Sequence, residues 1–194
     1  MGRFLGITGT PGTGKKSVAP LVSAKLGLPC LSLNELASSG RSGRAGAREF
    51  DVDTALLRRV LLKAARGPCV VHGHLVPDVL QKRDVDMVVV LRCDPAVLKM
   101  RLRARGCPPA KVAANVEAEL IGLVSASSIT RFGRSTVLEF DTTSTDAHEA
   151  AQSVARLLKR TIRPAPPIDW IGDYGSAVKL RSLLSDESTE SART

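Results

Sequence analysis

Residues 9–17 read Gly9-Thr10-Pro11-Gly12-Thr13-Gly14-Lys15-Lys16-Ser17. This run follows an apolar segment of strand type, Phe4 to Thr8, and precedes a segment of helix type, Val18 to Leu26. Glycines at this place allow several backbone N–H groups to converge on phosphate oxygens, while a helix N-terminus and a lysine add positive charge. The sequence therefore predicts a phosphate-binding loop of the nucleotide-binding kind.

One position of the loop departs from the usual pattern. The residue after the lysine is ordinarily Ser or Thr, whose hydroxyl binds the Mg²⁺ that bridges two phosphates. Here that residue is Lys16, and Ser17 follows it, roughly 100° further round the helix. Ser17 supplies a hydroxyl and is one candidate Mg²⁺ ligand, although it does not occupy the position of the usual ligand. We expect the ATP phosphates to bind at Gly12, Thr13, Gly14, Lys15, Lys16 and Ser17.

The composition is that of a soluble globular protein. The 194 residues are 43% hydrophobic and 24% charged, and they suffice for one α/β domain. No apolar run approaches the roughly 20 residues that span a bilayer. The loop lies where a signal peptide would lie, so we expect a cytoplasmic protein without membrane contact. The four cysteines, Cys30, Cys69, Cys93 and Cys107, are scattered, which favours a reducing compartment and argues against a zinc site.

The chain is basic, with a formal net charge of +9. Such a charge suits phosphate-rich ligands, whether nucleotides or RNA. Surface Arg and Lys can also serve only to keep a protein soluble, so the net charge does not identify the partner.

Strand and helix patterns alternate along the chain. Apolar runs of strand type occupy residues 4–8, 29–33, 69–72, 86–91 and 136–140. Helical patterns occupy residues 15–26, 54–65, 95–105, 111–124 and 147–160. Strands separated by helices predict a parallel five-stranded sheet flanked by helices on both faces. Ligands of such sheets bind beyond the C-terminal ends of the strands.

Two segments fall outside this alternation. Residues 39–48 combine glycines with three arginines, which favours either a solvated linker or a mobile anion-binding flap. Beyond Arg163 a proline-rich spacer leads to Trp170, the only tryptophan, which we expect to pin the tail to the body. We expect the polar residues 185–194 to be disordered.

Several segments together resemble a known family. They are the loop at 9–15, residues 28–36, Asp51-Val52-Asp53, Val70-Val71-His72-Gly73-His74, Val90-Leu91-Arg92-Cys93-Asp94-Pro95, and residues 101–106 followed by Lys111, Asn115 and Glu119. In this order they resemble the adenylate-kinase-like ATPases of the adenylate kinase isoenzyme 6 type, including its archaeal members. The resemblance covers roughly residues 3–162, and its most specific part runs from Leu91-Arg92 to Glu119.

This resemblance implies a nucleoside monophosphate kinase-like domain over residues 1–162, with a monophosphate-binding flap at about 34–50 and a lid at about 101–112. Residues 163–194 would be a spacer and tail. The implied activity transfers the γ-phosphate of ATP to AMP or to water. The implied catalytic residues are Lys15, Arg101 and Arg105, and Arg101 also contacts ATP. The implied AMP-binding residues are Asn34, Arg41, Arg44, Asp53 and His74. The family further implies a role in small-ribosomal-subunit maturation through a ribosomal protein partner.

A second departure from the family pattern lies at the end of the strand at 69–72. The family offers an acidic residue and then a histidine two positions later; His74 matches the histidine, but the acidic position is His72. A carboxylate there would hold Mg²⁺ or its bound water, which imidazole does poorly. Both side chains expected to support the metal are thus altered, at Lys16 and at His72.

Two interpretations follow. In the first, the protein is an active kinase, Asp51 or Asp53 supplies the missing carboxylate for Mg²⁺, and Lys16 adds positive charge. In the second, it binds nucleotide, turns it over slowly, and works as a nucleotide-regulated assembly factor for a ribosomal protein or ribosomal RNA. Direct RNA contact is a further alternative, although one Trp, one Tyr and four Phe offer few surfaces for base stacking.

Overall fold

The computed structural model describes residues 3–39, 52–163 and 165–184. Its centre is a five-stranded sheet in the order β2-β3-β1-β4-β5, in which all neighbouring strands pair in parallel. The strands are β1 (Phe4–Thr8), β2 (Cys30–Ser32), β3 (Cys69–His72), β4 (Val85–Arg92) and β5 (Val137–Asp141). The predicted α/β fold with a parallel five-stranded sheet is therefore confirmed.

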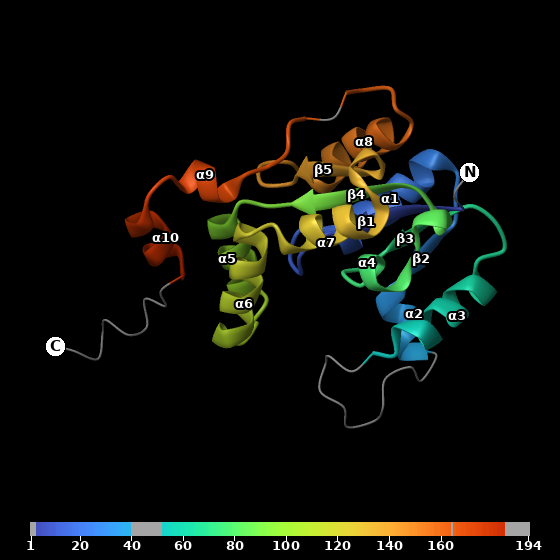
Figure 1. Cartoon of the computed structure of the whole chain (residues 1–194), viewed down its shortest axis with the longest axis horizontal. Coiled ribbons are helices and arrows are strands. Elements are labelled where there is room, and N and C mark those ends of the chain that lie inside the picture. The colour runs from blue at the N-terminus through green and yellow to red at the C-terminus, as the bar shows by residue number, and fades with distance from the viewer. Residues whose placement is uncertain (1–2, 40–51, 164, 185–194) are drawn as a thin grey trace.

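Helices cover both faces of the sheet (Figure 1). On one face pack α1 (Lys15–Leu26) and α8 (Ala147–Leu158), and on the other pack α2 (Leu33–Ser39), α3 (Thr54–Ala64), α4 (Val76–Val79) and α7 (Leu123–Phe132). Strand β4 shows why two cores form: Val88 and Val90 belong to one hydrophobic cluster, Val89 and Leu91 to the other. Short 3₁₀ turns, Lys82–Asp84 and Arg134–Thr136, lead into β4 and β5.

A third hydrophobic cluster lies beyond the C-terminal ends of the strands. It joins α5 (Pro95–Ala104) and α6 (Pro109–Leu120) to α9 (Trp170–Tyr174) and α10 (Ala177–Leu184). Helix α5 begins as predicted: Asp94 accepts hydrogen bonds from the N–H groups of Ala96 and Val97, and Pro95 occupies the first turn. The cluster forms the wall that faces the phosphate loop.

The predicted helix at 111–124 is wrong in its extent. Helix α6 ends at Leu120 and α7 starts at Leu123, with a bend of 53° between them. Gly122 makes the break, since its backbone adopts φ of +64°, a left-handed conformation that favours glycine. The hydrophobic stripe runs on past this glycine, so periodicity alone did not reveal the turn.

The segment after the proline-rich spacer folds back onto the body. Trp170 is buried and its Nε1 donates to Glu119 Oε1 at 3.3 Å, which confirms that this residue pins the segment. Tyr174 adds a hydrogen bond from its hydroxyl to Asp94 Oδ1 at 3.2 Å. Residues 185–194, expected to be disordered, lie outside the described residues.

Among the helices of the described ranges, none alone is long and apolar enough to cross a membrane; α6 and α7 meet that criterion of length and composition only as a bent pair.

Candidate nucleotide site

The glycines of the loop are required by its geometry. Gly9, Gly12 and Gly14 have φ of +141°, +101° and +96°. A Cβ on Gly9 would lie 2.3 Å from the carbonyl oxygen of Leu91, and one on Gly12 would lie 2.5 Å from Leu98 Cδ1. The loop can therefore run tightly between β1, β4 and α5 only without side chains at these places, as its sequence pattern predicted.

A cavity of about 350 Å³ opens above the loop. Four parts of the chain line it: the loop with the start of α1, the β2–α2 junction, the end of β3, and the corner between α5 and α6. Its lining contains Gly12, Gly14, Lys15, Lys16, Ser17, Asn34, His72, His74 and Arg105, all of which the sequence singled out. It also contains Ser32, Gly73, Cys107 and Lys111, to which the sequence analysis gave no role at the site.

Thr13 of the loop is not part of the cavity lining. It is fully buried and its Oγ1 donates to the carbonyl of Thr10 at 3.0 Å. In this structure its side chain braces the loop, and only its backbone is left to meet a phosphate.

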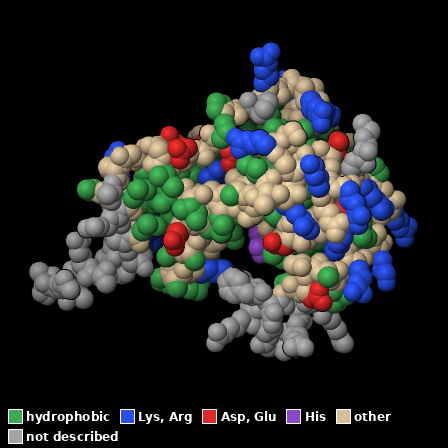
Figure 2. All heavy atoms as spheres, in the orientation of Figure 1, with side chains coloured by type: hydrophobic (Ala, Val, Ile, Leu, Met, Phe, Trp, Pro, Cys, Tyr) green, Lys and Arg blue, Asp and Glu red, His purple; other side chains and the backbone are tan. Residues whose placement is uncertain are grey.

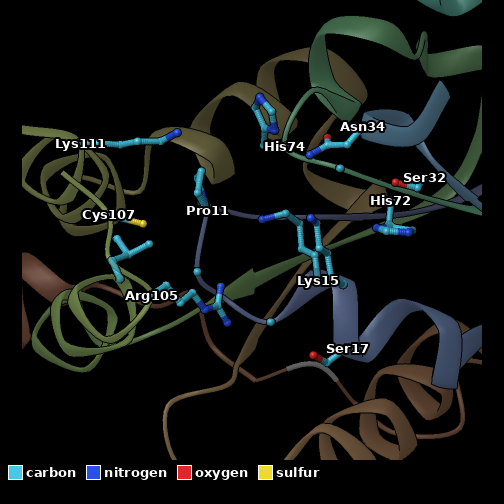
Figure 3. Close-up of a pocket in the computed structure, with 15 residues that line it drawn as sticks. Pro11, Lys15, Ser17, Ser32, Asn34, His72, His74, Arg105, Cys107 and Lys111 are labelled. Atoms are coloured by element: carbon cyan, nitrogen blue, oxygen red, sulfur yellow. The ribbon is translucent and has the colours of Figure 1, made fainter. Parts of the chain in front are cut away.

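The charge of the cavity is one-sided. Among the described residues that line it are four cationic side chains and no carboxylate: Lys15, Lys16, Arg105 and Lys111. Figure 3 shows Lys15, Arg105 and Lys111 approaching the same space from different sides. Figure 2 shows histidine side chains at a hollow between the α5–α6 part and the rest of the molecule. Such a concentration of positive charge suits a polyphosphate.

Lys15 is held at the mouth of its own loop. Its Nζ donates to the carbonyl oxygens of Gly9 at 2.6 Å and Thr10 at 2.9 Å. Although the residue keeps some exposure along its stem, desolvation of the ammonium lowers the pKa of Lys15 to about 7, against the opposing attraction of the Glu119 carboxylate. An arriving phosphate would replace the two carbonyls as the partner of this group.

The two lid arginines take different places. Arg105, which caps the C-terminus of α5, lines the cavity. Arg101 donates to the carbonyl oxygens of Thr142 at 2.8 Å and Thr143 at 3.1 Å and contacts Cys93 Sγ at 3.3 Å. In this structure Arg101 therefore ties α5 to the segment after β5, and of the two arginines only Arg105 lines the cavity.

A second cavity of about 1190 Å³ adjoins the first. It lies among α2, the start of α3, α4 and α7, and Asn34 and His74 line both cavities. Asp53 stays outside both linings, because its Oδ1 caps α3 by accepting from the N–H of Leu56 at 2.9 Å. The expected AMP ligands Arg41 and Arg44, with Asp51, lie outside the described residues.

The sequence analysis missed a buried network beneath the loop. Glu119 is 1% exposed and accepts from Thr10 Oγ1 at 2.5 Å, Arg92 Nε at 2.7 Å and Cys93 N at 3.0 Å. Arg92 also pairs with Glu139 at 2.6 Å. Asn115, four residues before Glu119 on α6, does not join this network, since it donates to the Lys111 carbonyl at 2.7 Å. A usable signal existed: Glu119 lies seven residues after Val112 and three after Val116, on the buried stripe.

The residues at the site do not fit a Mg²⁺ ion held by the protein. Magnesium requires hard oxygen ligands in octahedral arrangement, usually including carboxylates. The cavity offers the hydroxyls of Ser17 and Ser32 and the amide of Asn34, while the positions expected to support a metal carry Lys16 and His72. Across residues 3–39, 52–163 and 165–184, no group of three or more His, Cys, Asp or Glu side chains is arranged to hold a metal.

Known proteins are similar to this chain in sequence and in fold. A family profile described as "AAA domain" matches residues 5–122. The chain is 35% identical over 185 residues to the protein named "Putative adenylate kinase" from Thermococcus onnurineus (strain NA1), covering 94% of this chain and 99% of that one. Its fold is similar to a gluconokinase from Sinorhizobium meliloti 1021 (TM-score 0.58, 18% identity, 82% and 93% of the two chains) and to shikimate kinase from Acinetobacter baumannii in complex with shikimate (TM-score 0.57, 17% identity, 83% and 95%). The chain thus belongs to the P-loop AAA-domain family, as an adenylate-kinase-like member.

Proposed function

We propose that the protein is a nucleoside monophosphate kinase that transfers the γ-phosphoryl group of ATP to AMP, and more slowly to water. The observation that carries this proposal is that two neighbouring cavities share part of their lining. The first is built on the phosphate loop, the second lies under α2 and α3, and the side chains of Asn34 and His74 belong to both. A donor and an acceptor bound in these cavities would meet at those two residues.

The side chains assign the parts of such a transfer. The N–H groups of the loop and of the start of α1 would hold the β- and γ-phosphates, with Lys15 between them. Arg105 and Lys111 approach from the α5–α6 corner, where positive charge would stabilise the transferring phosphoryl group. Asn34 and His74 would orient the acceptor for in-line attack. Roles for Asp53, Arg41, Arg44 and Arg101 remain predictions from the resemblance. A Mg²⁺ held by Ser17 or Asp53 is not part of this proposal, because the cavity lining does not fit it.

The finer family assignment is also part of this proposal. The isoenzyme 6 type, a link to small-ribosomal-subunit maturation and a ribosomal protein or RNA partner are supported by the resemblance of the motifs and by the net charge of +9. They do not enter the chemistry of the two cavities. Of the expected flap at about 34–50, residues 40–50 lie outside the described residues, and Asn34, Ala37 and Ser38 line the second cavity. Of the expected lid at about 101–112, Leu102, Arg105, Cys107 and Lys111 line the first cavity, which supports the proposal.

The test measures products with and without an acceptor. We expect ATP plus AMP to yield two ADP for each AMP consumed, and ATP alone to yield less ADP, accompanied by inorganic phosphate. Lys15→Ala should abolish both reactions, whereas Lys25→Ala, an exposed lysine at the other end of α1, should change neither.

The other outcomes separate the competing functions. If GMP, CMP or UMP replaces AMP at equal rate, the protein is a nucleoside monophosphate kinase without a preference for AMP. If shikimate or gluconate does so, the acceptor class is wrong. If ATP binds and no ADP forms with any acceptor, the protein is the nucleotide-regulated assembly factor, for which the changes at Lys16 and His72 are the favouring observation.

A further inference from the structure

The two altered metal positions line the same cavity above the phosphate loop. Lys16 lies in the first turn of α1, and His72 is the last residue of β3, paired in register with Ile7 of β1. Strand β1 leads directly into the phosphate loop, so both side chains stand at the same end of the sheet. Both line the cavity above the loop. The two changes therefore act on one place.

Lys16 also lines a neighbouring hollow, shared with Ser32, Asn34 and Glu35. Its side chain thus lies between the cavity above the phosphate loop and the hollow beside α2. Desolvation by burial is the main cause that lowers the pKa values of Lys15 and His72, and the positive charge of Lys16 lowers both further, while the Glu35 carboxylate opposes the shift of His72. These effects agree with the geometry: the ammonium of Lys16 lies within electrostatic range of both groups.

Lys16 and His72 together bring the same net charge to the phosphates as a metal ion with its carboxylate ligand. In a P-loop protein with a metal, a Mg²⁺ of charge +2 and a carboxylate of charge −1 together bring a net +1 to the phosphates. Here the Lys16 ammonium brings +1 and a neutral His72 imidazole brings nothing, which gives the same net charge. A carboxylate at position 72 would cancel Lys16, whereas an imidazole leaves its charge available. The two departures are therefore consistent with each other.

We propose that the Lys16 ammonium takes the place beside the β- and γ-phosphates that Mg²⁺ takes in related loops, so that ATP binds without a divalent cation. This inference rests on the proposed function, because it requires ATP on the loop. Lys16 is exposed in the ATP-free protein and has a flexible four-carbon stem, so its ammonium can turn toward the phosphates. His72, at the end of β3, contributes because its neutral imidazole brings no negative charge that would cancel the charge of Lys16.

The test is ATP binding to the full chain by calorimetry, in excess EDTA and in MgCl₂. For the unaltered protein we expect dissociation constants that differ by less than about threefold, a shift of well under 1 kcal/mol. Lys16→Ser should weaken binding in EDTA by roughly tenfold or more, since a phosphate-binding charge is lost. Lys25→Ser, on the same helix, should leave both constants unchanged.

The double variant Lys16→Ser with His72→Asp restores a hydroxyl and a carboxylate at the two positions. We expect it to bind ATP only in MgCl₂, with circular dichroism confirming that it is folded. A loss of tenfold or more by the unaltered protein in EDTA would overturn the inference while leaving the proposed function intact. So would equal behaviour of Lys16→Ser and the unaltered protein in EDTA. Absence of ATP binding in both buffers would overturn the proposed function together with this inference.

Discussion

Replacing Glu119 by alanine should destabilise the protein far more than replacing a neighbouring glutamate. Glu119 is 1% exposed and accepts four hydrogen bonds, including one from Arg92 at 2.7 Å and one from the loop residue Thr10 at 2.5 Å. Removing one partner of a buried ion pair costs about 3–5 kcal/mol, because the other charge stays buried. Arg92 keeps a second partner in Glu139, so we expect the lower part of this range.

The measurement is urea unfolding followed by far-UV circular dichroism. For a chain of this length, a loss of about 3–4 kcal/mol, in the lower part of that range, corresponds to a fall in Tm of roughly 6–16 °C on heating. Glu119→Gln keeps an acceptor oxygen and should lose less. Glu117→Ala, an exposed position on the same helix, is the matched control, with an expected change within about 0.5 kcal/mol. If Glu119→Ala loses less than about 1 kcal/mol, the typical upper value for exposed ion pairs, the reasoning about burial is refuted.

Three further predictions follow from the loop and the tail. Because desolvation lowers the pKa of Lys15 to about 7 in the free protein, phosphate binding above that pH requires proton uptake, and the affinity for ATP should fall as the pH rises above 7. Lys15→Arg stays charged, so calorimetric titrations should show a flatter dependence of its ATP affinity on pH. An equal dependence on pH in both proteins would contradict a neutral Lys15 at high pH. Gly9→Ala should lower the free energy of unfolding by about 2–5 kcal/mol, because it combines the positive φ with a Cβ placed 2.3 Å from the Leu91 carbonyl oxygen. Gly27→Ala, with φ of +65° and open space around its Cβ, should lower it by about 1–2 kcal/mol. Equal losses, measured by thermal unfolding, would disprove the contribution of the clash with Leu91. Trp170→Ala should release α10, read as faster tryptic cleavage after Lys179, and an unchanged cleavage rate would show that α10 is held without it.

The sheet and the phosphate loop could be predicted because local patterns specify them. Strand β4 is a continuous apolar run, Met87 to Leu91, of the kind that is buried on both faces in a parallel sheet. The loop lies between a strand and a helix, which is the context its glycines require. Alternation of strands and helices predicts parallel pairing, and the right-handed rule for their connections leaves few topologies, although it does not by itself give the order β2-β3-β1-β4-β5.

The rest depends on contacts between residues far apart in the chain. Glu119 and Thr10 are 109 positions apart, and no local pattern says that a glutamate on a helix will lie under a loop. Lys111 and Cys107 reach the cavity only because α6 turns back against α5. Arg101 lies within α5, whereas Arg105, one turn further on, is its C-cap residue. That difference was invisible while the end of α5 was known only to within a turn.

The placement of negative charge around the loop ties these features together. The carboxylate that contacts the loop, Glu119, lies behind it in the protein interior, where it raises the pKa of Lys15 against desolvation. In front of the loop, the described lining of the cavity carries cations and no carboxylate. A carboxylate behind the loop can stabilise the charged lysine, but it cannot reach an ion that bridges phosphates in front. Glu35 lies with Lys16 at the neighbouring hollow and not in the lining of this cavity. Bound phosphates would therefore balance the charge of Lys15, Lys16, Arg105 and Lys111, as the proposed replacement of a metal by Lys16 requires.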